Sequence, residues 1–239
     1  MIAPNCMNCD SPKCFIKNFT KPEWKNKINK ERTTLKVSKS MTIFNEGDAV
    51  QGIYFIYKGK VKVYNNGIKN RTQIVRLANA GQILGHRGLG VSHKYPIGAS
   101  ALENSTLCFI PTHMFEQALK YNPALVLELM NFFVEELRRA ENKLRSLSQM
   151  TVRQKMAEAF ITLNEIYGSS KIENVPFLNV ELSRQDYADI TGASLEEVIR
   201  TISSMTKSKL IHSKGKRIGI TDHQKLAEML VDFGPLRLP

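Results

Sequence analysis

Residues 123–150 read PALVLELMNFFVEELRRAENKLRSLSQM, and this stretch decides how the rest of the chain is organised. Pro123 suits the first turn of a helix, and no Gly or Pro interrupts the run after it. Apolar residues recur at alternating steps of four and three, which is the spacing of a coiled-coil seam. The seam consists of Val126, Met130, Phe133, Leu137, Ala140, Leu144 and Leu147.

This pattern predicts a long helix that pairs with the same helix of a second copy of the chain. The alternative is a core helix that packs on its own domain. Four flanking residues widen the apolar stripe in the first half, namely Leu125, Leu127, Leu129 and Phe132. The two interpretations are compatible, since the first turns can pack on a domain while the later turns pair with the partner helix. The sequence therefore predicts a homodimer.

The bulk properties point to an anionic partner. The chain has 239 residues, enough for two domains with their own cores. Its net charge of +12 favours nucleic acid first and a membrane surface second. No apolar run is long enough to span a bilayer, and the polar N-terminus does not resemble a signal peptide. We therefore expect a cytoplasmic protein with no membrane partner, whose four cysteines do not form structural disulfides.

Residues 37–110 have the pattern of short strands separated by turns. Residues 52–57 predict a buried strand, residues 60–64 alternate between apolar and polar, and residues 107–110 predict a closing strand. A turn signal at 45–48 precedes them. Short strands in this arrangement predict an all-β sandwich or barrel.

Residues 182–206 predict two short helices joined by a Gly-containing turn. The helices cover 184–190 and 195–205, and the turn is Thr191-Gly-Ala-Ser194. This order is the signature of a helix-turn-helix, in which the second helix enters the major groove of DNA. The alternative is a plain helical hairpin. The apolar residues expected to hold the two helices together are Ile190, Val198, Ile202 and Met205.

Further elements surround this motif. Helices are expected at 111–122, 152–167 and 222–232, with a loop or short strand over 171–181 and a tail over 234–239. Residues 209–220 predict a hairpin with a basic turn near Lys214 and Gly215.

Three cysteines near the N-terminus follow the spacing C-x2-C-x4-C, namely Cys6, Cys9 and Cys14. Thiolate is the ligand for zinc and for iron–sulfur clusters. A closed site needs a fourth ligand, and the remaining cysteine of the chain is Cys108. Spacing alone leaves a metal centre and a set of free thiols both open.

The strand region carries a resemblance to known proteins. The motifs Phe44-x-Glu-Gly-Asp48, Gly52-Ile-Tyr-Phe-Ile56, Gly59-Lys-Val-Lys-Val63 and Gly81-x3-Gly85 resemble the β-roll of cyclic-nucleotide-binding domains. Together with the long helix and the helix-turn-helix, the whole chain resembles the Crp/Fnr family of bacterial transcription regulators. The resemblance implies an α+β fold. Its implied parts are a Cys-containing arm with a β-roll sensor over 1–122, a dimerisation helix over 123–150, and a winged helix-turn-helix over 151–239.

The ligand pocket departs from the pattern of the nucleotide-binding members. Those members carry Gly-Glu after the last motif and, later, an Arg that pairs with the cyclic phosphate. Here Gly85 is followed by His86 and Arg87, and residues 95–100 contain no arginine. Arg87 is a possible substitute, but a cyclic nucleotide is not the expected ligand, and another signal is implied.

The oxygen-sensing fumarate–nitrate reduction regulators offer such a signal. In these members three N-terminal cysteines and one on the last β-roll strand hold a [4Fe–4S] cluster. Cys108 matches the strand position, and the last N-terminal spacing is one residue shorter than in the best-known members. The resemblance thus implies a cluster on Cys6, Cys9, Cys14 and Cys108, with zinc or free thiols as alternatives. The resemblance also implies that an intact cluster favours dimerisation along residues 126–147. Oxygen would destroy the cluster and thereby weaken the dimer.

The resemblance also assigns the DNA-contacting residues. The family's recognition helix resembles Glu-x-x-x-Arg, which here is Glu196 and Arg200; Arg can read guanine and Glu can accept from cytosine. Ile199 stands where the best-known members carry Gly or Ser, so it either meets a thymine methyl or blocks the usual base. The positions that match phosphate contacts are Ser183, Arg184, Ser194, and, on the hairpin that looks like a wing, Lys214 and Lys216.

We therefore expect a homodimeric transcription regulator that binds a palindromic duplex site, contacts RNA polymerase and responds to oxygen or redox state. It is not expected to be an enzyme, because no nucleophile–base constellation or H-E-x-x-H motif is present. One alternative is a regulator of the same fold that responds to a small molecule without a cluster. The other is a metal- or redox-binding protein whose DNA domain is vestigial.

Overall fold

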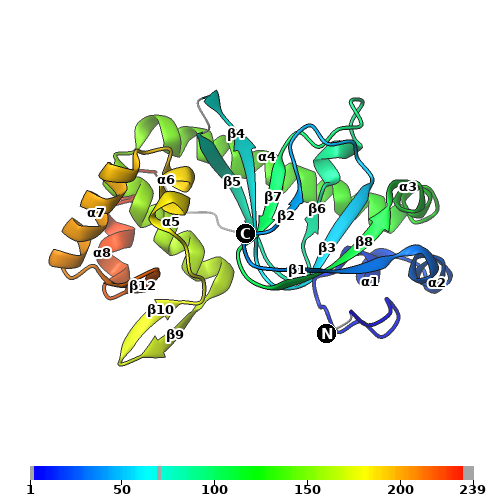
Figure 1. The fold of residues 1–239 in the computed structure, drawn as a ribbon, viewed down its shortest axis with the longest axis horizontal. Coiled ribbons are helices and arrows are strands. Elements are labelled where there is room, and N and C mark those ends of the chain that lie inside the picture. Colours follow the sequence, from blue (N-terminus) through cyan, green and yellow to red (C-terminus); the bar gives the residue numbers. More distant parts are fainter. Residues whose placement is uncertain (1–2, 69–70, 234–239) are drawn as a thin grey trace. The chain divides into compact units, whose positions relative to one another are not determined.

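The computed structural model describes residues 3–68 and 71–233. The chain divides into two compact units, one formed by residues 1–70 and 75–139, the other by residues 71–74 and 140–239. Figure 1 shows the helices and strands of both. Each unit is described by itself below.

The first unit begins with two helices, α1 (Phe15–Phe19) and α2 (Pro22–Glu31). Pro22 occupies the first turn of α2, where its missing N–H costs no hydrogen bond. Trp24 is buried and stacks on Tyr121, with ring centroids 5.0 Å apart. Helix α1 has no counterpart in the sequence expectations, because five residues are too few for helical periodicity to be read.

Two four-stranded sheets form the β-roll, in the strand orders β1-β8-β3-β6 and β2-β7-β4-β5. Their strands are β1 (Thr33–Val37), β2 (Thr42–Phe44), β3 (Gly52–Lys58), β4 (Val61–Asn66), β5 (Thr72–Ala78), β6 (Ile83–Leu84), β7 (Gly98–Ala101) and β8 (Ser105–Pro111). Strands β3 and β8 pair antiparallel in continuous register from Gly52 opposite Pro111 to Ile56 opposite Leu107, and the register shifts before Lys58 opposite Thr106. The strands expected at 52–57, 60–64 and 107–110 are thereby confirmed.

The turn between β3 and β4 depends on Gly59. Its φ is +114°, and a Cβ placed there would lie 2.1 Å from the Ser105 hydroxyl. Both the backbone conformation and the close approach therefore require glycine. The turn brings β4 back so that Val61 and Val63 join an apolar core with Phe44, Tyr54 and Leu107.

Helix α3 (Thr112–Tyr121) leads into α4 (Pro123–Gln149), so the long helix predicted for 123–150 is confirmed. Its first turns divide into two faces. Leu125 and Leu129 are buried in the apolar cluster that also holds Phe15, Ile28 and other side chains of the first unit. Leu127 is 61% exposed, so the three flanking leucines do not act together as the stripe suggested.

The second unit contains α5 (Val152–Tyr167) and a four-stranded sheet in the order β11-β12-β10-β9. The sheet strands are β9 (Ser169–Ile172), β10 (Val175–Leu178), β11 (Ile211–Lys214) and β12 (Arg217–Ile220), and the remaining elements are α6 (Arg184–Thr191), α7 (Leu195–Lys207), α8 (His223–Glu228) and η3 (Val231–Phe233). The expected loop or strand at 171–181 is thus part of a hairpin, β9–β10. The last helix is shorter than expected, because it ends at Glu228 and only a 3₁₀ turn follows. The predicted tail at 234–239 lies outside the described residues.

Among the helices of residues 3–68 and 71–233, none combines the length and the apolar character that a membrane span requires.

Leu125 and Leu127 provide a matched test of the two faces of α4. We expect Leu125→Ala to lower the free energy of unfolding by about 2–5 kcal/mol, because removing this fully buried side chain leaves a cavity in its place. Leu127→Ala should change it by less than about 1 kcal/mol, since this side chain is exposed. Urea unfolding of both variants measures the difference; equal losses would contradict the assignment of faces.

Candidate functional site

The helix-turn-helix is built from two capped helices. Helix α6 begins after Ser183, whose hydroxyl accepts from the Asp186 N–H at 3.0 Å while the Asp186 carboxylate accepts from the Ser183 N–H at 2.8 Å. Helix α7 begins after Ser194, which forms the same reciprocal arrangement with Glu197. Gly192 lies between the helices in the left-handed conformation, with φ +64°. The caps and the glycine set the angle between the two helices.

The inner faces of these helices are buried. Ile190, Val198, Ile202 and Met205 all lie in the interior, as the sequence predicted. Tyr187, which the prediction omitted, is fully buried between them and meets Phe160 of α5 edge-on at 5.5 Å. Burial raises the pKa of its hydroxyl well above the ordinary value. The helices are thereby held against α5, and the outer face of α7 stays free.

The outer face of α7 presents the predicted base-reading residues. Glu196 and Arg200 are both exposed and lie one turn apart. Ile199 is 49% exposed, and Leu195 beside it is also exposed. In the described part of the chain, neither Glu196 nor Arg200 has a hydrogen-bond or ion-pair partner. A helix that exposes a cation, a carboxylate and two apolar side chains together has the composition of a base-reading surface.

The predicted phosphate contacts occupy three different situations. The hydroxyls of Ser183 and Ser194 are engaged as helix caps. Arg184 donates to the Ser213 hydroxyl at 2.6 Å and to the Gly215 carbonyl at 3.0 Å, so it ties α6 to the β11–β12 turn. Lys214 lies 3.4 Å from Glu173 at the surface. A phosphate role for all of these residues stays a prediction.

Lys216 is exposed in the β11–β12 turn. Its neighbour Arg217 donates to the Glu181 carboxylate at 2.9 Å. The turn itself is open, since nothing lies within 4 Å of a Cβ built on Gly215. The turn therefore has the shape and charge of the wing that the sequence predicted.

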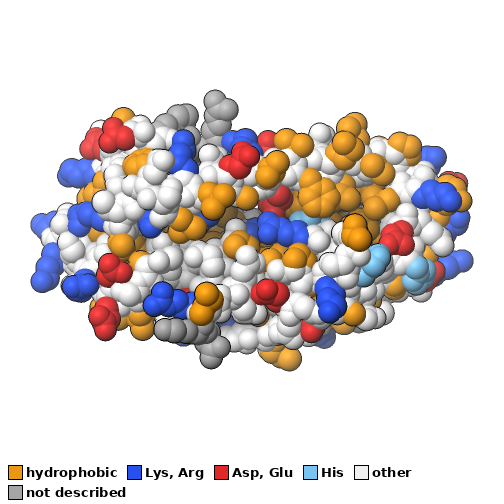
Figure 2. Space-filling view, turned by 90° about the horizontal axis from the view of Figure 1, so that it is seen from above, with side chains coloured by type: hydrophobic (Ala, Val, Ile, Leu, Met, Phe, Trp, Pro, Cys, Tyr) orange, Lys and Arg blue, Asp and Glu red, His pale blue; other side chains and the backbone are white. Residues whose placement is uncertain are grey.

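The predicted dimer seam runs along the open side of α4. Exposed large apolar side chains of the seam are Val126, Met130, Phe133, Leu137 and Leu144, while Ala140 is exposed and Leu147 half-buried. Val134 is exposed as well, although the alternating spacing does not include it. Figure 2 shows hydrophobic side chains gathered in one area of the surface. An exposed apolar stripe on a 27-residue helix is a surface that a second helix can cover.

The four cysteines lie in the first unit as free thiols, with Cys6 buried and Cys9, Cys14 and Cys108 half-buried. Burial raises the pKa of Cys6 to about 12, while nearby Arg32 lowers it and the charges of Cys14, Cys108 and Cys9 raise it further. Burial also raises the pKa of Cys14 to about 11. The thiols are thus close enough to affect one another's ionisation.

Asn29 and Arg32, at the end of α2, connect the cysteine arm to strand β8. The side-chain oxygen Oδ1 of Asn29 accepts from the Cys6 N–H at 2.9 Å and from Arg32 Nε at 3.0 Å. Arg32 donates to Cys108 Sγ at 3.3 Å and to the carbonyls of Ala3 and Pro4. Sequence reasoning missed both residues, because nothing in a basic, weakly helical stretch marks them.

These contacts allow a test of whether the thiols suit an iron–sulfur cluster. The donor set has the right chemistry, since such clusters take four thiolates. Burial raises the pKa of Cys108 above its ordinary value, and the Arg32 guanidinium beside it opposes that rise. However, residues 3–68 and 71–233 contain no group of three or more His, Cys, Asp or Glu side chains already arranged to hold a metal ion. The donors therefore fit a cluster in kind.

The pocket residues His86 and Arg87 lie at the helix α4 side of the β-roll. His86 is buried, and its ring meets those of Phe132 and Phe133 at 5.0 and 5.4 Å. Its two nitrogens have no hydrogen-bond partner among the described residues. Burial, then Arg76 and Arg87, hold its pKa well below the ordinary value. Arg87 is engaged with Glu136 at 3.0 Å.

The fold and these surfaces define a class: a cyclic-nucleotide-binding-type domain followed by a helix-turn-helix DNA-binding domain. Comparisons with known proteins agree. Residues 34–122 match the family model "Cyclic nucleotide-binding domain", and residues 154–229 match "Crp-like helix-turn-helix domain". The Fumarate and nitrate reduction regulatory protein of Escherichia coli K12 is 25% identical over 228 residues, which are 95% of this chain and 90% of that protein.

Solved structures share the fold. FixK2 from Bradyrhizobium japonicum superposes with a TM-score of 0.72 at 21% identity, over 83% of this chain and 96% of that one. The c-di-GMP responsive global regulator CLP from Xanthomonas campestris has a TM-score of 0.74 at 16% identity, over 84% of this chain and 99% of that one. The chain belongs to the Crp/Fnr family, and it is a DNA-binding transcription regulator of that type.

Replacing Arg200 tests whether this residue reads a base. We expect Arg200→Ala to weaken binding to the specific duplex by about 1–3 kcal/mol and to relax preference at one base pair. Its exposure means that thermal stability should be unchanged. Lys207→Ala on the last turn of the same helix is the control for loss of one charge. Measurement by fluorescence anisotropy on specific and random duplexes separates the two, and equal losses on both duplexes with Arg200→Ala would contradict base reading.

His86 should make stability depend on pH. Because its folded-state pKa lies below the ordinary value of 6.5, the unfolded chain binds a proton more readily than the folded one in this window. Stability should therefore fall as pH drops through 6.5 and continue to fall toward the lower folded-state value. Melting temperatures from pH 7.5 to 5 should fall less steeply for His86→Leu than for His93→Gln, a change at an exposed histidine. Parallel curves for the two variants would refute this role.

Proposed function

We propose that this protein is a homodimeric regulator that binds a palindromic DNA site and responds to oxygen or redox state through a [4Fe–4S] cluster held by Cys6, Cys9, Cys14 and Cys108. The observation that carries the proposal is that Cys108, distant in sequence from the three N-terminal cysteines, lies in the same region as they do. Cys14 and Cys108 pack against the apolar cluster that contains Cys6, and the thiols influence one another's ionisation. The likeness to a fumarate and nitrate reduction regulatory protein over nearly the whole chain supports it.

The chain's own residues would prepare this region in definite ways. Asn29 holds the backbone at Cys6, and Arg32 places a positive charge against Cys108. Because burial favours the protonated thiols of Cys6 and Cys14, assembly must release protons, and the Arg32 guanidinium assists this at Cys108. A bound cluster would supply the reactivity toward oxygen.

The dimer would follow from the exposed stripe of α4. Pairing of two copies along Val126 to Leu147 would bury the large apolar side chains of that stripe. A two-fold dimer presents two copies of α7, which is why a palindromic site is the matching target. RNA polymerase is the further partner that we propose for a regulator of this type.

The deciding experiment is iron and acid-labile sulfide analysis of protein purified without oxygen, with a visible spectrum before and after air. We expect about four irons per chain and an absorbance that bleaches in air. Cys108→Ser should lose the iron. It should still melt near the temperature of wild-type protein from which the cluster has been removed, because a half-buried thiol is replaced by a hydroxyl of similar volume. Absence of iron after reconstitution would refute the proposed cluster and leave the assignment as a DNA-binding protein unchanged.

A second candidate is a regulator of the same fold whose signal is a small molecule. It is favoured by the lack, in the described residues, of a preformed metal-binding group. In that case the wild-type protein holds no iron, and a ligand raises both its melting temperature and its DNA affinity.

A further inference from the structure

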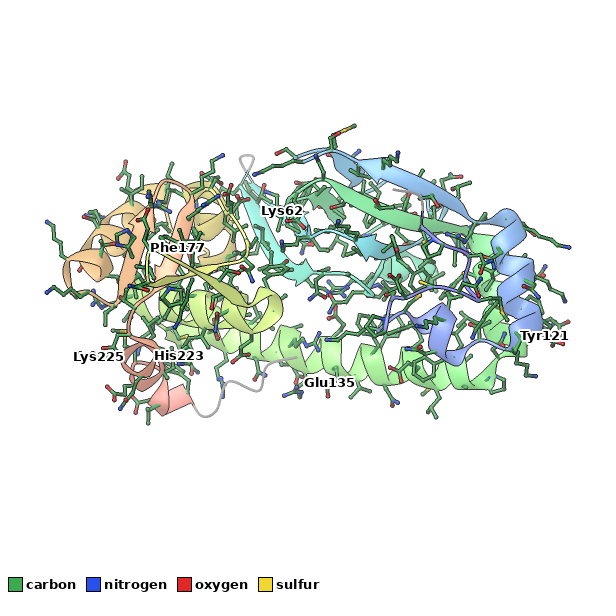
Figure 3. The ribbon with its side chains drawn as sticks, turned by 90° about the horizontal axis from the view of Figure 1, so that it is seen from below. Lys62, Tyr121, Glu135, Phe177, His223 and Lys225 are labelled. Carbon is green, nitrogen blue, oxygen red and sulfur yellow. The ribbon has the colours of Figure 1, made fainter. Side chains whose placement is uncertain are left out.

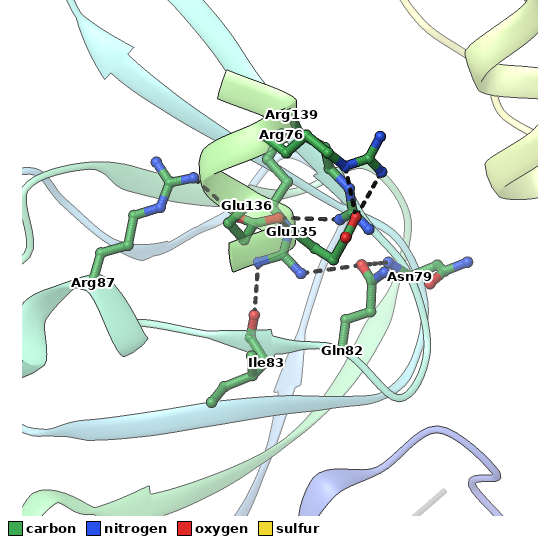
Figure 4. Close-up of polar contacts among 9 residues, drawn as sticks. Arg76, Asn79, Gln82, Ile83, Arg87, Glu135, Glu136 and Arg139 are labelled. Atoms are coloured by element: carbon green, nitrogen blue, oxygen red, sulfur yellow. Dashed lines mark hydrogen bonds and ion pairs between the residues drawn. The ribbon is translucent and has the colours of Figure 1, made fainter. Parts of the chain in front are cut away.

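Three arginines, one buried and two partly exposed, surround one buried carboxylate at the junction of the β-roll and α4 (Figure 4). The Glu136 side chain is only 7% exposed. Its two oxygens lie 3.0 Å from Arg87 Nη2, 3.2 Å from Arg139 Nη1 and 3.5 Å from Arg76 Nε. Two of the three arginines come from the β-roll, and Arg139 comes from the same helix as the carboxylate.

The β-roll fixes Arg76 without help from Glu136. Its Nη1 donates to the Ile83 carbonyl at 2.9 Å, and its Nη2 donates to Gln82 Oε1 at 3.3 Å. Gln82 Oε1 also accepts from the Asn79 N–H at 3.2 Å, which holds the amide in place. The guanidinium therefore faces this region as a preset donor, whichever anion meets it.

The charges of the cluster do not balance. Three guanidiniums meet one carboxylate. Arg76 is as buried as Glu136, whereas the Arg87 and Arg139 side chains are 29% and 31% exposed. The unpartnered nitrogens of His86 lie in the same region. A buried cation without an anion is costly, so Arg76 requires a negative group at the position of the Glu136 carboxylate.

We propose that Arg76, Arg87 and Arg139 form a binding site for a small oxyanion, and that Glu136 fills it as an internal ligand. The carboxylate fastens α4 to the β-roll without a free effector. While it is in place, free anions are excluded from the site. Removing the side chain opens a space of carboxylate size that acetate or inorganic phosphate can enter.

The test is anion rescue of Glu136→Ala in the full-length protein, with acetate, inorganic phosphate and chloride compared at constant ionic strength. The matched control is Glu135→Ala, because Glu135 projects from the surface of α4 and pairs with Arg138 (Figure 3). We expect Glu136→Ala to melt below wild type and to recover with acetate or phosphate. Its dissociation constant for these anions should be at least about tenfold lower than that of wild type or of Glu135→Ala, the equivalent of one charge-assisted hydrogen bond.

A double variant keeps the test decisive. Arg76→Met with Glu136→Met removes both buried charges and should be folded but insensitive to acetate, because losing both partners costs less than losing one. If Glu136→Ala is unfolded in the absence of added anions, the proposal requires that acetate refolds it and that chloride does not. The proposal is overturned if wild type and Glu136→Ala respond equally to the anions, or if acetate fails to stabilise or refold Glu136→Ala. It is also overturned if the double variant responds as the single variant does. Stabilisation of the wild-type protein by cyclic AMP would contradict it as well, because the proposal excludes free anions from the site while Glu136 is in place.

Discussion

Helix α4 must satisfy two environments along one continuous backbone, and much of the first unit depends on how it does so. On one side Leu125 and Leu129 enter the apolar cluster beneath α1 and α2. On the other side Met130, Leu137 and their neighbours face outward. The buried Glu136 would be unfavourable on a helix that merely crossed an apolar surface, and only the surrounding guanidiniums make its burial tolerable. Packing and ion pairing thus fix which face of the helix is left for a partner.

In the second unit, contacts between residues close in sequence fix the ends of the helices. Two capping boxes and one left-handed glycine define where α6 ends and α7 begins. These are sequence-local devices, and the buried side chains beneath them recur at helical spacing. That is why the helix-turn-helix could be predicted from the residues closely. The same local logic explains the long helix, whose seam is a regular repeat, and the strands, whose turns carry glycine and asparagine.

Features that depend on distant residues could not be predicted in this way. Arg184 had the appearance of a free cation at a helix start, yet its partners, Ser213 and Gly215, come from the far hairpin. The burial of Glu136 could not be predicted either, because its partners Arg76 and Arg87 belong to the β-roll and lie far from α4 in the sequence. Leu127 shares a spacing with buried leucines but lies on the other side. In each case the pattern gives the element, and the fold decides the surroundings.

The cysteine arm and the first turns of α4 share one apolar cluster. Cys6, Phe15 and Ile28 belong to it, as do Leu125 and Leu129, and Cys108 packs against it. Interiors of this density do not deform continuously, so a change in the volume or charge at the thiols has to be absorbed by repacking. Arg32 couples the two sides of this region, because the same guanidinium donates to Cys108 Sγ and to the Ala3 and Pro4 carbonyls of the N-terminal arm. Releasing one contact therefore alters the other, and the side chains that repack include those that seat α4 on the first unit.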